Sequence, residues 1–105
     1  MNTLTIEIRV AQIVDVHITG ETLTVDLSDG RTVSVPLAWY PRLVNSTPTE
    51  RNHWRLIGRG EGIHFSDIDE DISVENIVAG MPSSESQRSF QRWLEERQKS
   101  KTSYA

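Results

Sequence analysis

Residues 60–80, GEGIHFSDIDEDISVENIVAG, are the stretch from which we interpret the rest of the chain. Gly62–Phe65 has the composition of a short strand, and Ser73 precedes an apolar segment, Val74–Ala79, that Gly80 follows. Serine at an N-cap and glycine just after the last helical residue are the usual signals for the two ends of a helix. The stretch therefore predicts a strand, an acidic loop and a short capped helix in succession.

The acidic loop contains Asp67, Asp69 and Asp71 at alternate positions. This spacing resembles a calcium-binding EF-hand loop, which also requires glycine at its sixth position and glutamate at its twelfth. Those positions hold Ile72 and Val78, so the EF-hand interpretation fails. Three interpretations remain: a solvated turn whose carboxylates favour the N-terminus of the next helix, a contact surface for a basic partner, and a looser Mg²⁺ or Ca²⁺ site.

Length and composition limit the function classes. The chain has 105 residues, the size of one domain, and contains no cysteine, which excludes disulfides, thiolate zinc sites and thiol nucleophiles. No apolar run approaches the roughly 18–20 residues of a membrane helix. The alternating residues 1–9 do not resemble a signal peptide. We therefore expect a cytoplasmic protein that does not enter a membrane.

Charge is distributed unevenly along the chain. Residues 1–83 carry 6 basic and 12 acidic side chains, a net charge of −6, whereas residues 84–105 carry 5 and 3, a net charge of +2. An acidic body argues against non-specific nucleic-acid binding as the main role and favours a basic protein partner. The basic C-terminal segment leaves DNA binding open as a narrower alternative.

Alternation of apolar and polar residues indicates strands in the N-terminal half. We predict strands over about residues 11–18, 23–27 and 33–37, and an earlier strand or ordered arm over residues 4–9. Asp29-Gly30 lies between two alternating runs and is typical of a two-residue type I′ hairpin turn, in which both central residues have positive φ. The predicted class is α+β: an antiparallel sheet of three to four strands, two to three short helices and a C-terminal amphipathic helix.

Pro41 interrupts the apolar segment Leu37–Val44, and we expect one helical turn on each side of it. The segment contains Trp39 and Tyr40, adjacent aromatic residues of a kind enriched at protein interfaces. We treat both as candidate partner-binding residues. The alternative is one aromatic residue in the core and one half-exposed ring.

Thr47-Pro48-Thr49-Glu50 is a capping box with proline at the first helical position, and it predicts a helix that continues to about Leu56. Arg51, Arg55 and Arg59 would then share one face of that helix. Such a stripe would bind phosphate or a partner, or it would face the acidic loop of the same molecule.

Signals for catalysis are weak. The three histidines are too scattered in the sequence for a metal-ligand pattern, and the chain has no Gly-x-Ser-x-Gly nucleophile elbow. His64 lies three residues before Asp67 and would suit an acid–base pair. We expect no catalytic residue, no cofactor and no metal. A metal-dependent enzyme that uses His64 with Asp67, Asp69 and Asp71 remains the alternative.

The C-terminal segment follows a linker, Met81–Ser83, after which Ser84 or Ser86 caps a helix over about Glu85–Lys99. Its apolar face consists of Phe90, Trp93 and Leu94, at i, i+3 and i+4. We expect this face to dock on its own domain or in a groove of a partner, and a homodimer is a further interpretation. The predicted organisation is a compact α+β domain over residues 1–80, then over residues 81–105 a linker, a helix and a frayed end.

Several of these motifs together resemble the bacterial domain of unknown function family 2442. The resemblance spans about residues 10–80 and rests on the segments Asp26–Arg31, Trp39–Leu43, Arg51–Trp54, Gly62–Phe65, Asp69–Glu75 and Gly80. The family often has Trp where Phe65 stands, so an aromatic residue is kept at this position.

The resemblance implies a small α+β domain without an assigned activity. Members are often found beside small toxin-like proteins, which has suggested an antitoxin role. Some relatives continue into a helix-turn-helix DNA-binding domain. Only one helix is predicted after Gly80 in this chain, which is too little for that motif.

Composition, charge and resemblance together favour a non-enzymatic protein-binding module, which we interpret as the antitoxin-like partner of a small basic toxin. The candidate partner-binding residues are Asp67, Asp69, Glu70, Asp71, Trp39, Tyr40, Arg51, Arg55, Phe90, Trp93 and Leu94. The alternatives are the metal-dependent enzyme described above and DNA binding through the basic C-terminal helix.

Overall fold

The computed structural model describes residues 11–102, so the arm expected over residues 4–9 lies outside the described part of the chain. Six strands within that part form two antiparallel sheets of three, in the orders β1-β2-β3 and β4-β5-β6. Their bounds are Ile13–Ile18 (β1), Thr22–Leu27 (β2), Thr32–Pro36 (β3), Trp54–Ile57 (β4), Gly62–Phe65 (β5) and Glu70–Ser73 (β6). Helices connect and follow them, so the predicted α+β class is confirmed.

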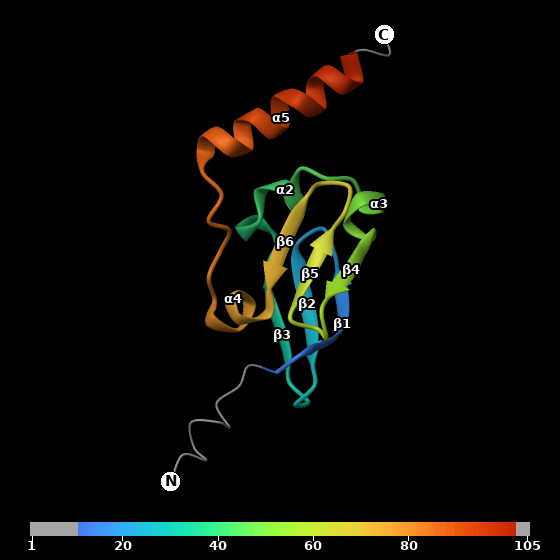
Figure 1. The fold of residues 1–105 in the computed structure, drawn as a ribbon, viewed down its shortest axis with the longest axis vertical. Helices are drawn as coiled ribbons and strands as arrows, with labels where there is room; N and C mark the ends of the chain where they lie inside the picture. Colours follow the sequence, from blue (N-terminus) through green and yellow to red (C-terminus); the bar gives the residue numbers. More distant parts are fainter. Residues whose placement is uncertain (1–10, 103–105) are drawn as a thin grey trace.

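The helices are a 3₁₀ turn η1 (Leu37–Trp39), α2 (Pro41–Val44), α3 (Pro48–Arg51), α4 (Val74–Ala79) and α5 (Gln87–Thr102). Figure 1 shows the second sheet in front of the first, with α2 and α3 near one end and α4 near the other. Helix α5 extends beyond α2 and α3. None of the helices in the described region is long and apolar enough to cross a membrane.

The core lies between the two sheets, whose buried side chains form one cluster. Its members are Ile13, Val16, Leu23, Val25, Leu27, Val35, Leu37, Tyr40, Leu43, Ile63, Phe65, Ile68, Ile72, Val74 and Ile77. Gly60 joins the sheets, because its carbonyl oxygen accepts a hydrogen bond of 2.8 Å from the Ile13 N–H. Its φ of +91° lies in the region that favours glycine.

The hairpin predicted at Asp29-Gly30 is confirmed, but its turn is not type I′. The Leu27 N–H donates to the Arg31 carbonyl at 2.8 Å, and the Gly30 N–H donates to the Leu27 carbonyl at 3.0 Å. The loop is therefore three residues long, and Gly30 has a positive φ (94°) while Asp29 does not. The Asp29 carboxylate accepts instead from the Arg31 N–H at 3.1 Å, a side-chain bond that favours the longer loop.

The capping box at Thr47 is confirmed, because Thr47 Oγ1 accepts from the Glu50 N–H and the Glu50 carboxylate accepts from the Thr47 N–H. The predicted continuation of the helix to Leu56 is wrong, since α3 ends at Arg51. Trp54–Ile57 is instead strand β4, paired with β5 in the register Trp54↔Phe65. Burial of Trp54 and Leu56 against the core outweighs the helical pattern.

Both predicted ends of α4 and the predicted serine cap of α5 are confirmed, whereas α5 continues to Thr102, beyond the predicted end at Lys99. Ser73 Oγ accepts from the Asn76 N–H at 3.1 Å, and Gly80 follows α4 in the left-handed conformation with φ 73°. Ser86 Oγ accepts from the Ser89 N–H at 3.1 Å at the start of α5. Both helices therefore begin at a serine cap, as expected.

Candidate functional site

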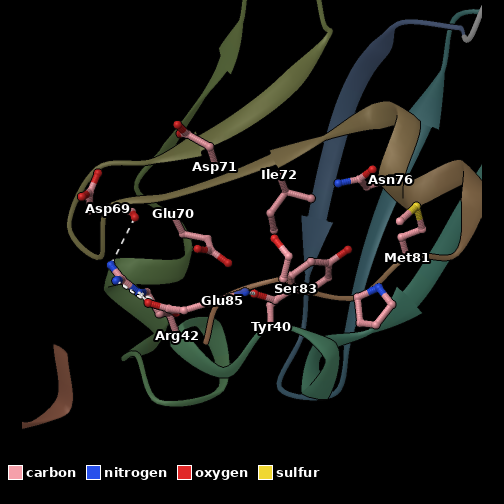
Figure 2. A pocket seen from close by; sticks show the side chains of 12 residues that line it. Tyr40, Arg42, Asp69, Glu70, Asp71, Ile72, Asn76, Met81, Ser83 and Glu85 are labelled. Atoms are coloured by element: carbon pink, nitrogen blue, oxygen red, sulfur yellow. Dashed lines mark hydrogen bonds and ion pairs between the residues drawn. The ribbon is translucent and has the colours of Figure 1, made fainter. Parts of the chain in front are cut away.

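A polar pocket of about 240 Å³ lies between strand β6, helix α2 and the segment that leads to α5. Figure 2 shows side chains from these three parts of the chain around it. Four lining residues are carboxylates, Asp69, Glu70, Asp71 and Glu85, and one lining residue is an arginine, Arg42. We call this set of five residues the acidic pocket.

Arg42 connects the parts of the chain that form the acidic pocket. Its Nη2 donates to Glu85 Oε2 at 2.6 Å and its Nε to Glu85 Oε1 at 3.0 Å, and the two side chains are only 14% and 12% exposed. Its Nη1 donates to the carbonyl oxygen of Ile68 at 2.8 Å. The hydrogen bonds from Arg42 hold the pKa of Glu85 below its usual range. The positive charge of Arg42 is therefore already neutralised by Glu85 within the protein.

Glu70 is half-buried at the wall of this pocket. Burial, followed by repulsion from Glu85, raises the pKa of Glu70 to about 7, although Arg42 opposes the shift. Figure 2 marks no hydrogen bond from the Glu70 carboxyl group to the other residues drawn. This carboxyl group is therefore poorly compensated when it is ionised.

We expect Glu70→Gln to stabilise the protein at alkaline pH. The folded-state pKa of Glu70 lies near 7, above the ordinary 4.5, so the native state binds more protons than the unfolded state between these values. Stability therefore falls as the pH rises through this window. After discounting for solvent screening, the variant should gain about 1–2 kcal/mol over the wild type at pH 8 and little at pH 4.

Urea unfolding of both proteins at the two pH values measures this difference. Glu75→Gln, which removes an exposed carboxylate from α4, is the matched control. A gain for Glu70→Gln that is the same at pH 4 and pH 8 would contradict the expectation.

The three aspartates of the acidic loop have different partners. Asp67 lies 3.0 Å from His53 Nδ1, and Asp71 contacts His64 Nδ1 across strands β5 and β6. Asp69, at φ 51°, contributes its backbone carbonyl as a second acceptor for Arg42. Of the residues of the alternative enzyme site, the structure pairs His64 with Asp71, whereas Asp67 pairs with a different histidine.

A second group of titratable side chains lies on the outer face of the first sheet. His17 Nε2 is 3.4 Å from Asp15 Oδ2 and 3.3 Å from Asp26 Oδ2. These three residues could offer a metal one nitrogen and two oxygen ligands, on an exposed surface. The grouping depends on an irregularity in β1 between Ile13 and Asp15, which makes Asp15 the direct partner of Asp26. Residue spacing alone does not show such an irregularity.

The predicted arginine stripe does not exist as a helix face, because Arg51 ends α3 and Arg55 lies in β4. Arg51 donates to the carbonyl oxygens of Leu43 and Val44 at 2.9 and 3.1 Å, so it stabilises the end of α2. Arg55 is exposed and is the cross-strand neighbour of His64. The arginine that contacts the turn at Asp69 is Arg42.

Trp93, on the predicted apolar face of α5, packs against the core of its own domain. The Trp93 ring lies under the guanidinium groups of Arg42 (5.2 Å) and Arg97 (4.6 Å), and Phe90 stacks on Trp93 at 5.9 Å. Arg97 also forms an ion pair of 3.0 Å with Glu50 at the start of α3. Leu94, like these residues, is half-buried. Charged groups therefore provide much of the attachment of α5.

The two aromatic candidates near Pro41 differ in burial. Trp39 is half-buried and packs against the core. Tyr40 is 3% exposed, and its hydroxyl group has no hydrogen-bond partner among the described residues. Burial, and then the nearby charge of Glu70, raises the pKa of Tyr40 above its ordinary value.

Arg42 and Glu85, the central pair of the pocket, were not among the candidates predicted from the sequence, because no local motif links residues 43 positions apart.

Comparison with known proteins shows a match between the sequence of this chain and one protein family. A sequence model described as "Protein of unknown function (DUF2442)" matches residues 13–83, from the start of β1 into the segment between α4 and α5. No curated protein matches the chain. A crystal structure of a protein of unknown function from Rhodospirillum rubrum ATCC 11170 is similar, with a TM-score of 0.63 and 21% identity, over 71% of this chain and 93% of that one. At this identity the similarity shows the fold alone.

Proposed function

The chain belongs to the DUF2442 family, whose function is unknown, and we propose that it is a non-enzymatic module that binds a basic protein partner. The observation that carries the proposal is the charge of the acidic pocket, whose lining contains four carboxylates and one guanidinium. That guanidinium is already bonded to Glu85 and to the Ile68 carbonyl, so the surplus of negative charge is open to a partner.

The charge of the whole body supports the same partner class. Residues 1–83 carry a net charge of −6, which attracts a basic protein over distances comparable to the Debye length. Complementary charge accelerates association and contributes to specificity. We favour a small basic toxin as the partner, bound in an antitoxin-like manner in the cytoplasm.

Apart from Glu70, the arrangement of the titratable groups near the pocket supports binding over catalysis. Glu85 is held by Arg42, and Asp67 and Asp71 each contact a histidine. Groups engaged in structural pairs present fixed charges, which suits recognition of an oppositely charged surface. In this proposal residues 1–80 contain the binding domain, and residues 81–105 contain a linker and a helical arm, whose end, expected to fray, lies outside the described residues beyond Thr102.

The direct test is co-expression with the product of the neighbouring reading frame, followed by purification at low and at high salt. We expect a stable complex with a basic protein that weakens as salt increases. Absence of any complex at low salt would contradict the proposal. Size-exclusion chromatography of the protein alone distinguishes a homodimer from this hetero-complex.

Replacement of Asp69 and Asp71 by lysine should weaken this complex about tenfold or more, because two attractive charges become repulsive. Isothermal titration calorimetry measures the affinity. The matched control replaces Glu21 and Asp29 by lysine, which changes the net charge equally on exposed loops of the first sheet. Equal weakening by both double variants would show that net charge, and not the acidic pocket, determines binding.

A further inference from the structure

Two carboxylates on the outer face of the first sheet lie directly opposite each other. Asp15 of β1 is the cross-strand partner of Asp26 of β2, because the irregularity between Ile13 and Asp15 shifts the register of β1. Like charges directly opposite each other destabilise a pair of strands. Within residues 11–102, no lysine or arginine forms a salt bridge with either carboxylate. The sheet therefore places two negative charges together without a permanent counter-charge.

His17 brings one nitrogen atom to the same place. It follows Asp15 by two residues on β1, so both side chains lie on the same face of the strand. A ring nitrogen carries at most one hydrogen, so His17 Nε2 cannot donate a good hydrogen bond to both carboxylates at once. One imidazole nitrogen and two carboxylate oxygens, contributed by two strands, therefore lie within 4.8 Å of one another.

The distances from His17 suit a shared metal ion better than they suit hydrogen bonds. A charge-assisted N–H···O bond is about 2.7–2.9 Å long, and His53, which has one carboxylate partner, lies 3.0 Å from Asp67. Zinc–nitrogen and zinc–oxygen bonds are about 2.0–2.1 Å long, so two ligand atoms of a tetrahedral zinc ion lie about 3.3–3.4 Å apart. His17 Nε2 lies 3.4 Å from Asp15 Oδ2 and 3.3 Å from Asp26 Oδ2.

Neighbouring groups hold the other oxygen of each carboxylate. Asp26 Oδ1 accepts a hydrogen bond of 2.8 Å from the Thr32 hydroxyl, and Asp15 Oδ1 accepts one of 2.8 Å from the Val16 N–H. Partners of this kind orient the side chains that bind metal ions. The remaining oxygen of each carboxylate, Oδ2, is the one that lies near His17 Nε2.

We infer that Asp15, His17 and Asp26 form a zinc-binding site on the outer face of the first sheet. Zinc accepts nitrogen and oxygen ligands together, whereas Ca²⁺ and Mg²⁺ prefer oxygen ligands. The side chains of His17, Asp15 and Asp26 are 57%, 56% and 38% exposed, so the ion enters from solvent, and water fills its fourth position. None of the three residues lines the acidic pocket, so the inference does not depend on the proposed function.

Isothermal titration calorimetry of the full chain, freed of any purification tag, with zinc chloride tests the site. We expect one zinc ion per chain, and we expect His17→Gln, Asp15→Asn and Asp26→Asn each to weaken binding about tenfold or more. The matched controls are His53→Gln and His64→Gln, because each removes a histidine that has one carboxylate partner. Both controls should bind zinc as tightly as the wild type.

NMR of the imidazole nitrogens identifies the histidine that binds the ion. Zinc should shift the Nε2 resonance of His17 and leave those of His53 and His64 unchanged. The amide spectra of the variants show that each remains folded. Absence of zinc binding to the wild type at millimolar zinc would overturn the site, and so would a His17→Gln variant that binds as tightly as the wild type. Equal affinity for Mg²⁺ or Ca²⁺ would overturn the assignment to zinc, because it would indicate attraction by the carboxylate charges alone.

Discussion

Gly60→Ala is expected to lower the free energy of unfolding by about 3–4 kcal/mol, a large fraction of the stability of about 5–15 kcal/mol that is typical of a single domain. A Cβ atom at this position would lie 2.3 Å from the Ile13 carbonyl oxygen and 2.8 Å from the Ile13 nitrogen. Both are backbone atoms of a strand, so they cannot move aside as a flexible side chain would. The hydrogen bond that joins the β4–β5 turn to β1 would break, and the positive φ would add strain.

Gly30→Ala is the matched control for this experiment. Gly30 has nearly the same φ, +94° against +91°, but a Cβ atom there meets nothing within 4 Å. It should therefore lose only about 1 kcal/mol, the conformational cost of alanine at a positive φ. Urea unfolding of both variants measures the difference between them. Equal losses would show that contact with Ile13 contributes nothing.

Arg42→Met is expected to cost about 2–3 kcal/mol and to release α5 from the domain. The substitution leaves the Glu85 carboxylate without its main partner, while the side chain stays largely buried. Breaking a fully buried ion pair by removing one partner costs about 3–5 kcal/mol, and this pair borders an open pocket, so the expected cost lies at or below the lower end of that range. Loss of the positive charge also removes the interaction that opposes the raised pKa of Glu70.

Two measurements follow the consequences of Arg42→Met. Urea unfolding gives the loss of stability, and limited proteolysis between residues 81 and 86 reports release of the helix. Arg55→Met, which removes an exposed arginine from β4, should change neither by much. A double variant that also carries Glu85→Gln should recover part of the loss, because it removes the unpaired charge. No recovery would show that the bonds from Arg42 to the carbonyl oxygens provide its main contribution.

Sequence signals that act within a few residues predicted the structure well. The caps at Thr47 and Ser73, the stop at Gly80 and the hairpin around Gly30 all depend on bonds between near neighbours. The helix predicted to Leu56 failed because β4 is stabilised by pairing with β5, which lies further along the chain. Local patterns cannot report such pairing.

The candidate site was predicted only in part, for the same physical reason. The acidic residues and Tyr40 were identified from composition and from interface preference. Arg42 and Glu85 were missed because the fold, and not their spacing, brings them to 2.6 Å. Arg51 and Arg55 were selected from a helical periodicity that the strand removes.

The position of Arg42 makes the acidic pocket and helix α5 parts of one thermodynamic cycle. A single guanidinium contacts Glu85 at the pocket and the Trp93 ring on the helix. A ligand that changes the Arg42–Glu85 geometry therefore changes the equilibrium between docked and released α5. By reciprocity, displacement of α5 changes the affinity of the pocket by the same factor.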